Sequence, residues 1–110
     1  MSNNEALIEQ ELQDKGLNAP RICPADVDSA IVSDTYTILP SGKCMICEIT
    51  LKNGFTVTGK SSCVSKENFN EEIGRKISYV DAREKIWAFL AYNLQDFLYR
   101  QENLDTLIKA

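Results

Sequence analysis

From Asp34 to Gly59 the sequence alternates apolar and polar residues, the pattern of β-strands with one buried face. The dipeptide at residues 53–54 is Asn-Gly, which is typical of a hairpin turn. A two-residue loop there would bring Glu48 onto the apolar face. A three-residue loop with a left-handed glycine instead pairs Leu51 with Phe55 and keeps that face apolar. The segment therefore predicts a three-stranded antiparallel meander.

This register sorts the side chains of the meander onto two faces. The apolar face would hold Tyr36, Ile38, Met45, Cys47, Ile49, Leu51, Phe55 and Val57. The other face would carry hydroxyls and charges with few apolar members: Thr35, Thr37, Cys44, Ile46, Glu48, Thr50, Thr56, Thr58 and Lys60. We therefore predict an α+β fold in which helices cover the apolar face of a meander over about residues 34–60. The polar face is either solvated or a surface for a partner or a small ligand.

Helical spacing lies on both sides of the meander. It predicts a short amphipathic helix over residues 4–15 and a second one that begins at Pro24 and includes Ile31. After a loop that opens at residues 60–62, Asn68 and Glu71 have the form of a capping box, and apolar residues then keep near-helical spacing to the C-terminus. Gly74 is a position where this helical region could break.

The length of 110 residues is enough for one hydrophobic core. We expect a single domain, 1–110, with N-terminal helices in 1–33, antiparallel hairpins in 34–64 and helices in 68–110. The apolar arc of the last region is wider than one sheet face requires. A second chain is the simplest way to bury the surplus, so the sequence predicts a homo-oligomer.

Composition excludes several classes of function. The chain has no histidine, which removes Ser-His-Asp and Cys-His catalysis and the most frequent zinc ligand. The net charge of −4 argues against binding of duplex nucleic acid. No apolar run is long enough to span a membrane, and the polar start of the chain does not have the form of a secretory signal, so we expect a cytoplasmic location.

The four cysteines do not have the spacing of a metal or redox centre. Cys44 and Cys47 lie three apart on a predicted strand, so their side chains point to opposite faces. Cys23 and Cys63 are isolated in the sequence and add no second ligand pair. We expect free thiols that mostly pack in the interior, with a four-thiolate zinc site as the less favoured alternative, and we expect no metal and no cofactor.

Motifs for enzymatic chemistry are weak. Residues 54–61 match the phosphate-binding expression G-x-x-x-x-G-K-[ST], but the variable residues form an alternating strand and no helix begins at Lys60. Asp81 and Glu84 could hold a metal from one helix face, although Asp81 could equally pair with Lys85 one turn away. We therefore expect a protein that is not an enzyme.

One group of residues suits an anionic nucleotide. Guanidinium and ammonium groups bind phosphate, while amides and hydroxyls suit ribose or base edges. The candidate ligand-binding residues are Thr58, Ser61, Ser62, Asn68, Arg75, Arg83 and Lys85. The alternative interpretation is that they are surface residues and helix caps.

Two motifs carry a family resemblance. The pattern Gly59-x-x-x-Cys63-Val64-x-x-x-Asn68-Phe69-x-x-Glu72-Ile73-Gly74-x-x-Ile77 is followed by Ala82-Arg83-x-Lys85-Ile86-Trp87. Together with residues 19–27, it resembles a family of small proteins of tailed phages and prophages, most of which have no assigned function. It is also similar to phage anti-Thoeris sponge proteins, which sequester cyclic ADP-ribose signals or cyclic oligonucleotides without degrading them.

The second resemblance implies an oligomer built on an antiparallel sheet with flanking helices, in which Asn68 contacts the ligand. The aromatic residue that the resemblance implies before Gly59 is Thr58 here, and the arginine implied on the later helix corresponds to Lys85. We therefore expect a phage-encoded anti-defence protein that binds and sequesters a cyclic nucleotide immune signal in the cytoplasm of an infected bacterium. The alternative is a phage protein-interaction module that inhibits a host protein.

Overall fold

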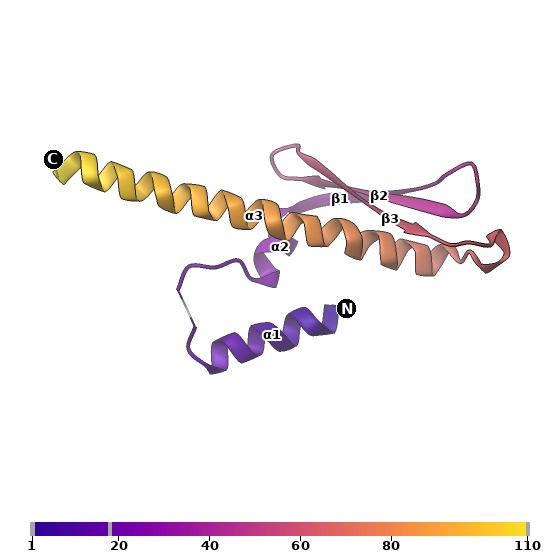
Figure 1. Ribbon diagram of the computed structural model, residues 1–110, viewed down its shortest axis with the longest axis horizontal. Coiled ribbons are helices and arrows are strands. Elements are labelled where there is room, and N and C mark those ends of the chain that lie inside the picture. The colour runs from indigo at the N-terminus through magenta and orange to yellow at the C-terminus, as the bar shows by residue number, and fades with distance from the viewer. Residues whose placement is uncertain (1, 18, 110) are drawn as a thin grey trace.

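The computed structural model describes residues 2–17 and 19–109 and has the predicted α+β fold. The elements, in chain order, are α1 (Ser2–Asp14), α2 (Pro24–Ala30), β1 (Ile31–Ile38), β2 (Cys44–Leu51), β3 (Thr56–Ser62), the short 3-10 helix η1 (Lys66–Asn68) and α3 (Glu71–Lys109). The strands form one antiparallel sheet in the order β1-β2-β3. In Figure 1 the sheet lies on one side of the first half of α3, and α1 and α2 lie on the other side.

The register of the sheet confirms the predicted faces. Leu51 donates its amide to the Phe55 carbonyl at 2.8 Å, and Gly54 between them has φ +87°. The loop therefore has three residues, because only glycine adopts this backbone conformation without strain. On the other side of β2, Tyr36 pairs with Cys47 and so shares its face.

The core lies between the apolar sheet face and α3. Its buried members are Met45, Cys47, Ile49, Leu51, Val57, Ala82 and Ile86, and Val27 of α2 joins the same buried cluster. The sheet and helix backbones come closest at Gly59, where a Cβ would lie 2.2 Å from the Ser78 carbonyl oxygen and 2.3 Å from the Ala82 nitrogen. Any side chain at this position would collide with backbone atoms, so the crossing requires glycine.

Two side chains of α3 occupy the outer edge of β3. Asp81 accepts a hydrogen bond from the Lys60 amide at 2.9 Å, and Lys85 donates to the Thr58 carbonyl oxygen at 2.5 Å. Asp81 and Lys85 therefore bond to the backbone of β3 and not to each other as the ion pair that the sequence suggested. These bonds satisfy backbone groups that an edge strand leaves open.

α3 is one helix of 39 residues, about 58 Å long, and the predicted weak point at Gly74 does not interrupt it. Gly74 is buried against Met45 and Phe69, and this packing outweighs the low helix propensity of glycine. The molecule measures 65 × 32 × 21 Å because the second half of α3 extends beyond the sheet (Figure 1).

Several predicted element boundaries are wrong. The first helix begins at Ser2 and ends at Asp14, and Ile31 belongs to β1 rather than to the second helix, because it pairs with Leu51 and β-branched residues favour strands. β3 continues through Ser61 to Ser62, where the sequence predicted a loop. The cap of α3 is Asn70, whose Oδ1 accepts the Ile73 amide at 3.0 Å, instead of Asn68.

Candidate functional site

A buried arginine on α3 organises the side of the helix that faces away from the sheet. The Arg83 side chain is 10% exposed and donates to two carboxylates. Its Nε and Nη2 reach the Glu5 oxygens of α1 at 3.0–3.3 Å, and its Nη1 reaches Asp28 Oδ1 of α2 at 2.6 Å. One turn further along α3, Trp87 Nε1 donates to Glu5 Oε1 at 3.0 Å. The cluster thus joins α1 and α2 to α3.

The charges of this cluster stabilise one another. Hydrogen bonding from Arg83 lowers the pKa of the Glu5 carboxyl, although burial opposes this effect. Burial by itself would lower the pKa of the Arg83 guanidinium, but its hydrogen bonds to Glu5 and Asp28 have the larger combined effect. The pKa of Arg83 is therefore raised above its ordinary value. Glu5 and Arg83 are therefore both ionised at neutral pH.

The cluster lies at the wall of a groove between α1 and α3 with a volume of about 810 Å³. Ile8, Pro24, Ile77, Tyr79 and Val80 supply apolar and aromatic lining, while Lys76 and Glu84 add charges beside Arg83 and Glu5. Small-molecule sites combine this kind of apolar surface with a few polar groups, and this volume lies within their usual range. The groove therefore has the size of a small-molecule site, and its wall combines apolar surface with the ion cluster of Arg83, Glu5 and Asp28.

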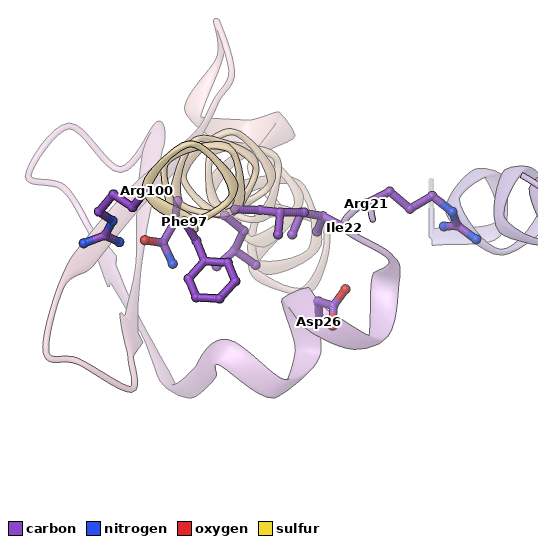
Figure 2. Close-up of a pocket in the computed structure, with 8 residues that line it drawn as sticks. Arg21, Ile22, Asp26, Phe97 and Arg100 are labelled. Carbon is purple, nitrogen blue, oxygen red and sulfur yellow. The ribbon is translucent and has the colours of Figure 1, made fainter. Parts of the chain in front are cut away.

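A second hollow of about 370 Å³ lies along the C-terminal half of α3. Figure 2 shows Phe97 and Arg100 on α3, Ile22 on the segment that leads into α2 and Asp26 in α2. The Arg21 guanidinium points away toward α1, where it pairs with Glu9, and Arg100 points to the opposite side (Figure 2). The two cations therefore do not converge on one ligand.

The remaining predicted site residues are divided among other surfaces. The Arg75 guanidinium carbon lies 4.7 Å from the centre of the Tyr36 ring, on the sheet side of α3. Lys85 and Thr58 meet at the β3 edge through the Thr58 carbonyl. Ser61 is buried on the core-facing side of the sheet, where it pairs with Met45.

Ser62 and Asn68 lie near the end of β3. The Ser62 hydroxyl is 3.6 Å from the Cys44 sulfur on the open face, and Asn68 is exposed in η1. The structure therefore separates Arg83 from the other predicted ligand-binding residues.

Sequence reasoning missed the partners of Arg83. Glu5, Asp28 and Trp87 had no assigned role, although Arg83 and Trp87 lie one helical turn apart and so share a face. An arginine beside a tryptophan on an otherwise apolar helix face indicates a buried anion partner. Nothing in the sequence says which carboxylate it is, because the partners lie 78 and 55 residues away.

Cys44 and Cys47 lie on opposite sheet faces, as predicted, and Cys47 is buried. Burial raises the pKa of the Cys47 thiol. Within the described residues, no three Cys, Asp or Glu side chains are arranged to hold a metal ion. In the same part of the chain, no helix has the length and apolar character needed to cross a membrane.

Comparison with known proteins identifies a family but no described relative. No curated protein and no solved structure matches the chain, so the resemblance to sponge proteins remains a prediction. The phage protein (N4 Gp49/phage Sf6 gene 66) family matches residues 22–98, which include α2, the whole sheet and most of α3. The chain belongs to this phage protein family.

Proposed function

We propose that this phage protein binds and sequesters a cyclic nucleotide immune signal without turning it over. The observation that carries the proposal is the Glu5 carboxylate on Arg83 and Trp87, because it shows that this wall of the groove holds an oxyanion. A phosphate makes the same bidentate contact with a guanidinium. The apolar and aromatic groove beside it would accommodate a base.

In this proposal Glu5 competes with the ligand for Arg83. The phosphate would displace the Glu5 carboxylate while Asp28 stays in place, because Asp28 bonds to a different guanidinium nitrogen. Lys76, which also lines the groove, would add a second cation for the phosphate. The other predicted ligand contacts, at Arg75, Lys85, Thr58, Ser61, Ser62 and Asn68, then have no part in this site.

Calorimetric titration with cyclic dinucleotides, cyclic trinucleotides and cyclic ADP-ribose isomers tests the proposal. We expect micromolar or tighter binding to one class, loss of binding in Arg83→Met and tighter binding in Glu5→Gln, since the competing charge is gone. Arg75→Gln is the matched control, because it removes a guanidinium from α3 on the sheet side. If Arg75→Gln alone abolishes binding, the site is on the sheet side. If neither wild type nor Glu5→Gln binds any compound, sequestration is wrong.

The second candidate is a protein-interaction module, and the exposed second half of α3 favours it. From residue 87 to residue 104 no side chain is buried, and Tyr92, Tyr99 and Leu104 are 75%, 57% and 57% exposed. Large exposed apolar residues on one helix are typical of protein-binding surfaces. Capture of a host protein that Tyr92→Ser and Tyr99→Ser abolish, with no nucleotide bound, would favour this candidate.

A further inference from the structure

The two edges of the sheet differ in how their backbone groups are covered. Asp81 and Lys85 bond to the outer edge of β3, as described above. Among the described side chains, none makes such a bond to the outer edge of β1. Natural sheets usually protect an edge strand of this length, because its open amides and carbonyls can pair with another strand.

The register shows which β1 residues present these open groups. Leu39 donates its amide to the Cys44 carbonyl at 2.9 Å, and hydrogen-bonded pairs alternate along an antiparallel ladder. Ser33, Thr35 and Thr37 therefore bond to β2, whereas Asp34 and Tyr36 direct their amides and carbonyls outward. The irregularity between Ile31 and Ser33 lies at the start of the strand, and the pairing with β2 is continuous from Ser33 to Ile38.

We propose that β1 pairs antiparallel with β1 of a second copy about a two-fold axis at Thr35, which joins two three-stranded sheets into one of six strands. This register places chemically matched residues opposite each other. Asp34 lies opposite Tyr36, Ser33 opposite Thr37, and the exposed Val32 near Ile38, with Thr35 opposite itself. Within one chain the Tyr36 hydroxyl already donates to Asp34 Oδ2 at 2.6 Å, so these two side chains are compatible neighbours.

Alternative registers are less favourable. An axis at Asp34 would place two carboxylates directly opposite each other, which is destabilising. An axis at Tyr36 would use fewer residues of the strand. The Thr35 register also satisfies the outward backbone groups, because residues 34 and 36 pair with each other across the axis. β1 is thus complementary to itself in one register, which is what a two-fold interface requires.

The proposal holds whether or not the protein binds a nucleotide. In the proposed dimer, the Arg75–Tyr36 pair of each copy would lie on the sheet face that α3 covers, one pair on each side of the two-fold axis.

Charge at the axis provides the test. Light scattering with size-exclusion chromatography should show a dimer of about twice 12.4 kDa for the wild type. Thr35→Lys and Thr35→Glu should each weaken the dimer about fivefold, because like charges then lie directly opposite. Mixing the two variants should restore it. Thr37→Lys is the matched control, since Thr37 is exposed on the same face but does not lie opposite itself.

A second measurement does not depend on charge. Thr35→Cys should form a covalent dimer on mild oxidation, because the Cα atoms of a non-hydrogen-bonded antiparallel pair lie about 4.5 Å apart, within the range of about 4.4–6.8 Å that a disulfide spans. Thr37→Cys and the wild type should not do so. A wild type that stays at 12.4 kDa at high concentration would overturn the proposal. A dimer that survives Thr35→Lys and does not cross-link through Thr35→Cys would also overturn it, because the interface would then lie away from the β1 edge.

Discussion

Replacement of Gly59 by alanine tests the closest contact in the fold. The added Cβ would lie 2.2 Å from the Ser78 carbonyl oxygen and 2.9 Å from the Ala82 Cα, whereas ordinary contact begins at 3.4 Å. Since all these atoms belong to the α3 backbone, no side-chain rotation relieves the collision. β3 and α3 must separate by about 1.2 Å, the difference between 3.4 and 2.2 Å.

This separation weakens the packing around Val57, Ala82 and Ile86. Overpacking a core usually costs about 1–3 kcal/mol, and rigid backbone neighbours place this substitution at the upper end. Replacing a strand glycine returns about 0.5–1 kcal/mol through lower chain entropy in the unfolded state. We therefore expect the free energy of unfolding to fall by about 2 kcal/mol or more, out of a total of about 5–15 kcal/mol.

Thermal and urea unfolding followed by circular dichroism measure this loss. A decrease of 2 kcal/mol corresponds to a Tm lower by about 8–16 °C in a domain of this size. Thr58→Ala is the matched control, because Thr58 is the adjacent residue and its side chain is exposed. Its stability should change by less than about 0.5 kcal/mol. A Gly59→Ala protein as stable as the Thr58→Ala protein would refute the backbone contact between β3 and α3.

Three further predictions concern other contacts. Because the pKa of Glu5 is lowered in the folded protein, its contribution to stability is present above its unfolded pKa of 4.5 and is lost as the pH falls through the folded value. Fluorescence of Trp87, the single tryptophan, should report this acid transition, and a transition of equal size in Glu5→Gln would contradict its assignment to Glu5. Asp81→Ala should lower the free energy of unfolding by about 1 kcal/mol, measured by urea unfolding, because the Lys60 amide loses its partner. It should also promote aggregation through the β3 edge, measured by turbidity. Unchanged turbidity would argue that Asp81 does not protect this edge. Cys47 should resist alkylation in the folded protein while Cys44 reacts, and mass spectrometry of the modified peptides measures both. Faster alkylation of Cys47 than of Cys44 would show that the two sheet faces are wrongly assigned.

Much of the sheet could be predicted from the sequence because its determinants are local. The alternation along residues 34–59 sets which side chains share a face, and Gly54 after Asn53 selects a three-residue loop. These two features together place Leu51 opposite Phe55 and fix the register of β2 with β3. Local capping was harder to predict, since Asn68 and Asn70 both precede the helix and only the chain path shows that Asn70 is the cap.

The candidate site depended on contacts between distant residues. Arg83, Asp81 and Lys85 lie within one and a half turns of α3, yet Arg83 bonds to α1 and α2 while the other two bond to β3. The sequence alone determined the elements and the faces of the sheet, because these follow from periodicity and turn chemistry. Only the tertiary structure decided that Gly59 meets α3 and that Glu5 neutralises Arg83, because each depends on how elements far apart in the chain pack together.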